Sequence, residues 1–117
     1  VRIPKPNPFA NALSGGNLQK FIVGREISRD PKLLIANQPT WGVDIGAALA
    51  IRKAIINVAE KGSAVILISQ DLEEIFLISD KIAVINSGQI SKPFYKDDIS
   101  IEDVGLLMGG VNLEAKI

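Results

Sequence analysis

The 117-residue sequence contains no cysteine and no histidine. The lack of cysteine excludes disulfide bonds and thiolate chemistry, and the lack of histidine removes the commonest acid–base catalyst of proteins. The usual ligand sets of zinc, which draw on these two residue types, are missing as well. Metal binding is therefore left to hard cations held by oxygen ligands. A chain without cysteine is also consistent with a cytosolic protein.

Long apolar runs and a phosphate-binding P-loop are missing too. No apolar run reaches the ~18 residues that a membrane-spanning helix needs. No glycine is followed directly by lysine, so the sequence has no loop of the GxxxxGK[ST] type. The 13 basic and 13 acidic side chains cancel, and this balance argues against a dedicated nucleic-acid binder.

Charge is nevertheless unevenly distributed. Residues 1–61 hold nine basic and four acidic side chains, and residues 62–117 hold four and nine. The first part could face an anion, although two oppositely charged solvated faces are the more ordinary interpretation. With 47% apolar residues, the chain can form a core, either of one modest domain or of part of a larger one.

Helical and strand-like segments alternate along the chain. Apolar spacing predicts helices over 13–30, 45–62, 71–79 and 101–109. Continuous apolar runs predict buried strands over 32–36, 63–69 and 81–85, and a turn at 86–88 leads into a shorter strand over 89–91. Residues 1–12, with three prolines, are expected to be an extended lead-in. This order predicts an α/β fold with a mostly parallel sheet flanked by helices.

Helix ends are marked by capping residues. Ser14 and Asp71 are candidate N-caps, and Glu74 completes a capping box with Asp71. Asp30-Pro31 is expected to end the first helix, and Gly62 the second. The predicted apolar face of the second helix consists of Ile45, Ala48, Leu49, Ile51, Ile55, Val58 and Ala59.

The Ser14-Gly15-Gly16 sequence precedes the first helix. Backbone N–H groups at a helix start can approach a phosphate closely where glycine leaves no Cβ in the way. The Ser14 hydroxyl adds a further hydrogen-bonding group, and Lys20 can add charge one turn later. Taken alone, the three residues favour ordinary helix capping.

The longer string LSGGNLQK (13–20) resembles the signature motif of ATP-binding cassette (ABC) ATPases, in the form typical of sugar and nucleoside importers. The resemblance continues through DPKLLIANQPTWGVDIGA (30–47), similar to the Walker B strand and D-loop. It extends through AVILISQDLEEIFLISDKIAVINSGQI (64–90), similar to the switch-histidine region, to VGLLMGG (104–110). Residues 13–110 match in order and spacing.

The resemblance implies a partial P-loop NTPase (ABC ATPase) fold that lacks the Walker A half. Residues 1–117 are expected to be the C-terminal fragment of one nucleotide-binding domain, most similar to the second cassette of the importer proteins. Its segments are the lead-in over 1–12, the signature helix over 13–30 and, over 31–110, the Walker B, D-loop and switch region with the C-terminal strands and helix. The implied nucleotide-contacting residues are Ser14, Gly15, Gly16, Asn17, Gln19 and Asp44.

Three positions depart from the family pattern. Asn37 and Gln38 stand where the Walker B strand has Asp and Glu, and Gln70 stands where the family has its switch histidine. A carboxamide forms hydrogen bonds but brings no charge to Mg²⁺ and cannot take a proton from water at neutral pH. The resemblance therefore implies a degenerate site without intact catalytic residues and without metal ligands.

Several residues keep two interpretations. Asp44 matches the D-loop aspartate, and it is equally suited to cap the helix that follows. Trp41, the only tryptophan, is either a partly exposed aromatic anchor or packed under its loop. Arg25 and Arg29 are expected on a solvated face.

The implied function is that of an energy-coupling ATPase subunit of a nucleoside or sugar importer, with ATP and Mg²⁺ in the full assembly but neither bound tightly to this fragment. The implied partners are a second cassette and transmembrane permease subunits, on the cytoplasmic face of the membrane, without nucleic acid. A non-catalytic regulatory or remnant module that pairs with an ATPase is the alternative. A chromosome-maintenance ATPase is a weaker alternative, because coiled-coil arms and a basic surface are absent from the sequence. Without the missing half, the fragment should expose apolar surface and self-associate.

Overall fold

The structure, a computed structural model, describes residues 15–111. The chain divides into two compact units, with the boundary between Gln70 and Asp71. The predicted extended lead-in over 1–12 and the predicted cap Ser14 lie outside the described residues.

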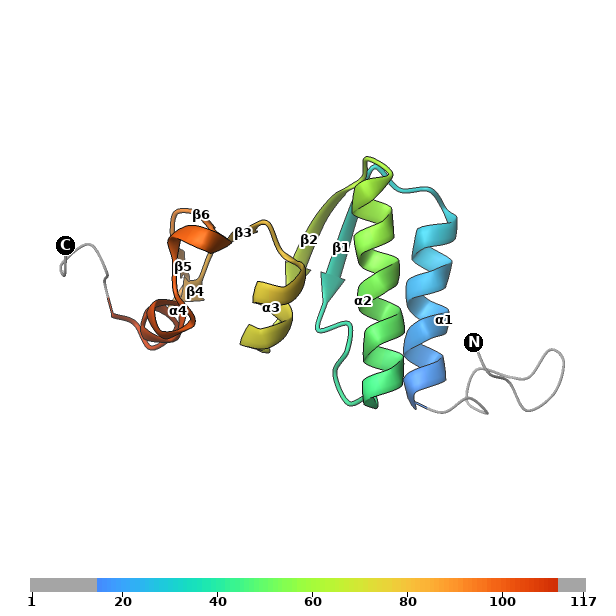
Figure 1. The fold of residues 1–117 in the computed structure, drawn as a ribbon, viewed down its shortest axis with the longest axis horizontal. Coiled ribbons are helices and arrows are strands. Elements are labelled where there is room, and N and C mark those ends of the chain that lie inside the picture. Colours follow the sequence, from blue (N-terminus) through green and yellow to red (C-terminus); the bar gives the residue numbers. More distant parts are fainter. Residues whose placement is uncertain (1–14, 112–117) are drawn as a thin grey trace, which may run out of the picture. The chain divides into compact units, whose positions relative to one another are not determined.

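The first unit contains two helices and two strands. They are α1 (Gly15–Ser28), β1 (Leu33–Asn37), α2 (Ile45–Glu60) and β2 (Ala64–Ile68). β1 and β2 are parallel, in a register that runs from the Leu33–Ala64 pair to the Asn37–Ile68 pair. Helices α1 and α2 pack side by side, and α2 also packs on β2 (Figure 1). The segment β1–α2–β2 is thus a βαβ unit, as the alternating pattern predicted.

The ends of α2 follow from the residues at its two boundaries. Asp44 Oδ1 accepts the backbone N–H of Ala47 at 2.8 Å, which satisfies one of the free donors of the first turn. After Lys61 the chain turns at Gly62, whose φ of 104° is open to glycine at little cost. Ser63 Oγ then donates to Pro31 O at 2.6 Å and joins the loops that lead into β1 and β2. The predicted stop at Gly62 is confirmed.

The buried stripe of α2 is narrower than predicted. Its buried residues are Ala47, Ala48, Ile51, Ile55 and Val58. Ile45, Leu49 and Ala59, which the sequence placed on the apolar face, are exposed. Within the described residues α2 packs on α1 and on β2, and its buried residues follow one stripe spaced at about one helical turn.

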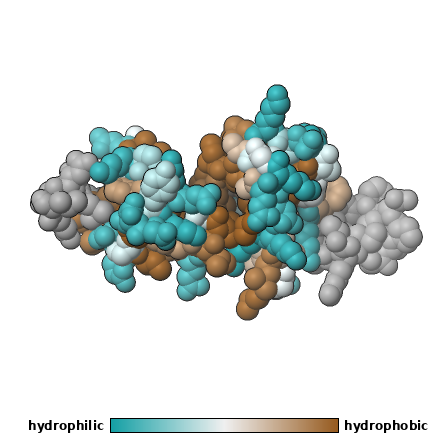
Figure 2. All heavy atoms as spheres, turned by 45° about the horizontal axis from the view of Figure 1, so that its top comes forward, coloured by the Kyte–Doolittle hydropathy of each residue, from teal (hydrophilic) through white to brown (hydrophobic). Residues whose placement is uncertain are grey.

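The two strands are covered on one face only. Leu34 of β1 is buried, while its neighbours Leu33 and Ile35 are about half exposed. On β2, Ile66 and Ile68 are exposed as well, so the four side chains lie between 43% and 58% exposed. Alternate residues of a strand point to opposite faces, so these four define a bare apolar face. The prediction that the strands are buried on both faces is therefore wrong for residues 15–111. The predicted exposure of apolar surface is confirmed. Apolar side chains are brown in Figure 2.

The second unit contains α3 and four short strands before its last helix. Its elements are α3 (Leu72–Ile78), β3 (Lys81–Ile82), β4 (Ile85–Asn86), β5 (Gln89–Ile90), β6 (Phe94–Tyr95), the 3₁₀ helix η2 (Lys96–Asp98) and α4 (Ile101–Met108). β3 pairs with β6 and β4 with β5, both antiparallel. The buried residues Ile82, Val84, Ile99 and Val104 form its core.

The strand predicted over 81–85 is two short pieces. Between them Val84 donates its N–H to Ser91 Oγ at 2.9 Å, and its carbonyl accepts the N–H of Ser91 at 2.8 Å. A side-chain oxygen thus replaces a strand partner at this point, and the chain changes partner from β6 to β5.

The predicted cap and turn of this unit are confirmed. Asp71 accepts the N–H of Glu74 at 3.2 Å and caps α3. Ser87 and Gly88, with φ of 51° and 78°, form the turn between β4 and β5. Two consecutive residues with positive φ are the requirement of a tight hairpin turn whose twist matches its strands.

Candidate functional site

Two glutamines meet at the carboxyl ends of the parallel strands. Gln38 follows β1, and Gln70 comes two residues after β2. The N–H of Gln38 donates to Ile68 O at 2.7 Å, which extends the strand pairing by one bond. Gln38 Oε1 accepts the N–H of Gln70 at 3.4 Å. Ligands of open α/β sheets bind at this edge, and the structure brings both predicted residues to it.

Gln38 adopts a left-handed backbone conformation, with φ of 50°. This conformation brings the Cβ of a residue other than glycine close to the following carbonyl oxygen. It also starts a tight turn, because the N–H of Trp41 donates to Gln38 O at 3.1 Å. The turn carries the chain sharply away from β1 toward α2.

A third glutamine reaches the same place from α1. Gln19 Nε2 donates to Pro39 O at 3.2 Å, across 20 residues of sequence, in a partly buried position. Pro39 is itself buried, whereas the following Trp41 is 73% exposed. The interpretation of Trp41 as packed under its loop is therefore wrong for the described chain.

These side chains line a shallow hollow that is widely open to solvent. It measures about 400 Å³ and is lined by Gln19, Gln38, Trp41 and Gln70. The lining thus offers three carboxamides and one indole but no charged group. A carboxamide donates and accepts hydrogen bonds without ionising, so this hollow can orient a polar ligand or a water molecule but cannot take a proton from it.

Asn37 does not join the other amides. It ends β1 in alternation with Leu33 and Ile35 and is exposed like them, which places it on the bare apolar face. Among residues 15–111, no three acidic residues come close enough to hold a metal ion. The structure therefore brings together two of the three substituted positions, Gln38 and Gln70, and adds Gln19 from the signature segment.

The remaining predicted site residues lie at helix starts. Asp44 is exposed and caps α2, the structural role that the sequence allowed. Gly15, Gly16 and Asn17 form the first turn of α1, where free N–H groups give a helix its affinity for anions. Ser14 lies outside the described residues.

Arg25 and Arg29 are exposed, as predicted for a solvated face. Arg25 Nη2 lies 3.4 Å from Glu26 Oε1, and Arg29 Nη1 lies 3.9 Å from Glu26 Oε2. Such exposed pairs contribute little to stability.

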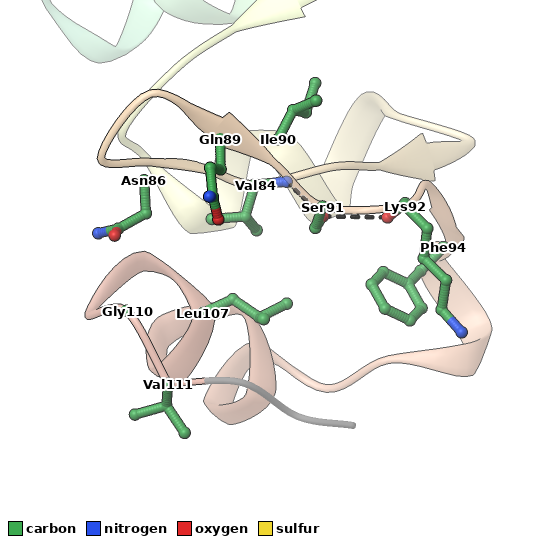
Figure 3. A pocket seen from close by; sticks show the side chains of 10 residues that line it. All are labelled: Val84, Asn86, Gln89, Ile90, Ser91, Lys92, Phe94, Leu107, Gly110 and Val111. Carbon is green, nitrogen blue, oxygen red and sulfur yellow. Dashed lines mark hydrogen bonds between the residues drawn. The ribbon is translucent and has the colours of Figure 1, made fainter. Parts of the chain in front are cut away.

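A second hollow, which the sequence did not reveal, lies within the second unit (Figure 3). It measures about 370 Å³ between the β4–β5 hairpin and the end of α4. Lys92 Nζ lies 5.3 Å from the centre of the Phe94 ring on its wall. At the end of α4, Asn86 Nδ2 donates to Met108 O at 2.8 Å.

In the part of the chain that the structure describes, no helix is both long and apolar enough to span a bilayer.

Solved structures with the same arrangement are nucleotide-binding cassettes. A nucleotide-free ATP-binding cassette of an ABC transporter superposes with a TM-score of 0.71 and 24% identity, over 86% of this chain and 41% of that one. A second ABC cassette superposes with a TM-score of 0.66 and 25% identity, over 86% of this chain and 38% of that one. The chain therefore has a partial ABC ATPase fold, an α/β fold with parallel strands flanked by helices.

Curated proteins with similar sequences are import ATP-binding proteins. A glucose import ATP-binding protein of Haloferax volcanii is 52% identical over 101 residues, which are 86% of this chain and 18% of that protein. A guanosine import ATP-binding protein of Bacillus subtilis is 49% identical over 94% of this chain and 22% of its own length. A ribose import ATP-binding protein of Yersinia pestis is 35% identical over 99% of this chain and 23% of its own length. The chain is thus homologous to part of the ATP-binding proteins of ABC importers for sugars and nucleosides.

The match covers only a segment of each relative. The chain spans about a fifth of the length of these curated proteins. No protein-family profile matches it.

Proposed function

We propose that the chain supplies the signature-bearing half of a nucleotide-binding domain in an ABC importer for nucleosides or simple sugars. In this proposal Ser14, Gly15 and Gly16 bind the ATP of a second cassette, with Asn17 and Gln19 in the same segment. The N-terminal turn of α1, where the glycines lie, supports this role because its N–H groups are free to meet a phosphate. Permease subunits at the cytoplasmic face of the membrane complete the proposed assembly.

The observation that carries the proposal is the neutral amide hollow at the carboxyl edge of β1 and β2. Gln38 and Gln70 are joined there by a hydrogen bond, and no charged residue lines the hollow. Loss of a positioned base costs roughly 10²–10⁴ in rate. A unit charge pair at ~4 Å is worth about 4 kcal/mol at an effective dielectric of 20, so a lost carboxylate weakens Mg²⁺ binding severely. We therefore propose that this site holds ATP without hydrolysing it, while the partner site turns over.

The proposed difference between a non-hydrolysing site in this chain and a hydrolysing partner site is tested by restoring the side chains of the family pattern. The assembled transporter is allowed to turn over ATP, and the nucleotide retained on it is extracted and identified. Wild type should retain unhydrolysed ATP. The combined variant Asn37→Asp, Gln38→Glu, Gln70→His should retain ADP instead, because it regains a carboxylate base at position 38 and an imidazole at position 70 in the hollow, and a carboxylate at the end of β1. Retention of ADP alone by wild type would refute the degenerate site.

The signature role is tested on α1. Ser14→Arg should abolish turnover, because a bulky side chain at the helix start blocks the approach of the partner's phosphate. Ser28→Arg, at the opposite end of α1, makes the same exchange at an exposed position and should leave turnover unchanged. Unchanged turnover in Ser14→Arg would overturn the signature assignment.

The alternative is a regulatory or remnant module that pairs with an ATPase without binding nucleotide. The uncharged lining of the amide hollow supports it, since triphosphates are ordinarily bound by cations and backbone N–H groups. An equilibrium titration of the assembly with ATP separates the two functions. One site per cassette pair favours the alternative, and two sites favour the proposal.

A further inference from the structure

We infer that Gln19 is a positioning residue that couples the Gly15-Gly16 start of α1 to the loop over 38–44. This inference rests on the proposed function where it places ATP at the glycine pair. It adds a mechanical link between that pair and the amide hollow, through the Gln19 side chain, which lines the hollow and donates to the Pro39 carbonyl.

The helix geometry places Gln19 one turn after Gly15. Residues four apart lie on the same face of a helix. Gln19 therefore follows the glycine pair along the face that carries it to the loop, where its Nε2 lies 3.2 Å from Pro39 O. The side chains of Arg25 and Ser28, by contrast, make their hydrogen bonds within α1, to Glu26 Oε1 and Arg25 O.

The acceptor, Pro39 O, lies directly after the residue that begins the turn of the loop. Pro39 directly follows Gln38, whose left-handed backbone begins the turn closed by the Trp41 N–H. The Gln38 side chain in turn holds the N–H of Gln70. Inside the loop, the bond from Val43 N to Thr40 O is long, at 3.4 Å. The Gln19 bond thus fixes the loop from outside, and a displacement of the α1 start passes through it to Gln38 and Gln70.

The link depends on a donor at position 19. Glutamine offers two N–H groups, whereas glutamate of the same shape offers only oxygen and would face the Pro39 carbonyl oxygen with a negative charge. Methionine has a similar length and flexibility but no donor. Gln19→Met and Gln19→Glu therefore remove the bond while they keep much of the packing. Arg25→Met is the matched control on the same helix, because the exposed Arg25 side chain pairs, among residues 15–111, with its neighbour Glu26.

Hydrogen–deuterium exchange of the complete assembly, with and without ATP and Mg²⁺, measures the coupling in peptides over 15–20 and 38–44. Without nucleotide, both Gln19 variants should exchange about two- to tenfold faster over 38–44, the effect of losing one ordinary hydrogen bond. ATP should protect both peptides in wild type and in Arg25→Met. In Gln19→Met it should protect 15–20 but no longer 38–44. A residue with a merely structural role would not separate the two responses.

The other outcomes are also decisive. If ATP protects neither peptide in wild type, the glycine pair does not bind nucleotide, and the proposed function fails together with the coupling. If ATP protects both peptides in Gln19→Met, the proposed function stands and the coupling is wrong. Loss of protection in both peptides of Gln19→Met would show a general disturbance of α1 and would likewise refute a specific link.

Discussion

Gln38 combines a backbone conformation and a side-chain contact that favour different amino acids. Its φ of 50° is easiest for glycine. Its side chain, however, accepts the N–H of Gln70, and its backbone N–H extends the pairing of β1 with β2. Non-glycine residues with positive φ concentrate at functional sites, and this one lies at the edge where the two strands end.

Gln38→Gly should be more stable than Gln38→Ala. Both variants lose the long bond to Gln70, so their difference isolates the effect of the Cβ at positive φ. The left-handed conformation costs a non-glycine residue about 1–2 kcal/mol, from which the greater flexibility of unfolded glycine subtracts about 0.4–1 kcal/mol. We expect a net difference of about 0.5–1 kcal/mol in the free energy of urea unfolding, at an unchanged m-value. An alanine variant as stable as the glycine variant would contradict the backbone assignment at this residue.

At the scale of elements, α2 depends on its cap. Asp44→Ala should lower the free energy of unfolding by about 1 kcal/mol, because the Ala47 N–H loses its acceptor. Asp44→Ser keeps a capping oxygen and should recover most of that loss. If both replacements cost the same, the contribution of Asp44 to stability would not lie in its cap.

The Asn86 side chain forms a hydrogen bond between the β4–β5 hairpin and the end of α4. Asn86→Ala should lower the free energy of unfolding by about 0.5–1.5 kcal/mol, because Met108 O loses its donor. Asn86→Asp keeps the shape of the side chain but puts an oxygen against that carbonyl, and it should be at least as unstable. Gln89→Ala, at an exposed position of the same hairpin, is the control. Thermal unfolding in which Asn86→Asp matched wild type would argue against the bond.

The sequence predicted elements better than their contacts. All four helices were predicted, since caps such as Asp71 and stops such as Gly62 are local signals. The single strand predicted over 81–85 was wrong, because the structure has two short strands there. Val84, between them, donates to Ser91 Oγ seven residues away, and the apolar pattern of the sequence does not indicate such a bond. The predicted burial of Ile45 and Leu49 was also wrong, because burial on a helix depends on which elements pack against it, and that is not a local signal.

For the candidate site, the sequence likewise predicted the residues better than the contacts between them. Gln38 and Gln70 could be placed together because parallel strands end at one edge. Asn37 was grouped with them, although the period of two in a strand turns adjacent residues to opposite faces. Gln19 was connected to the site only by the resemblance of its motif. Its bond to Pro39 spans 20 residues and depends on the placement of α1, which a sequence pattern does not define.

At the scale of the whole molecule, the bare apolar face of β1 and β2 is the surface most prone to association. Half-exposed Leu33, Ile35, Ile66 and Ile68 form a contiguous apolar surface on paired strands. Large exposed apolar patches on soluble proteins mark interaction surfaces or sites of association. The unpaired outer edges of a two-stranded sheet add a template for further strands.

The isolated chain should therefore self-associate, and charge on this face should prevent it. In sedimentation velocity, wild type should shift to larger species as concentration rises, while Ile35→Lys with Ile66→Glu should sediment closer to a monomer. Ile45→Lys is the control, because Ile45 is exposed but belongs to α2 and not to the two strands that form the face. A wild-type chain that remained monomeric at the highest concentration would disprove the prediction.

Trp41 gives the molecule a natural optical reporter. It is the only tryptophan of the sequence, it borders the amide hollow and it is 73% exposed. The indole emission of the chain therefore arises at one place, in contact with water. A collisional quencher such as iodide should reach it freely, and any ligand, subunit or second copy that covers the hollow should shield it and shift the emission to the blue.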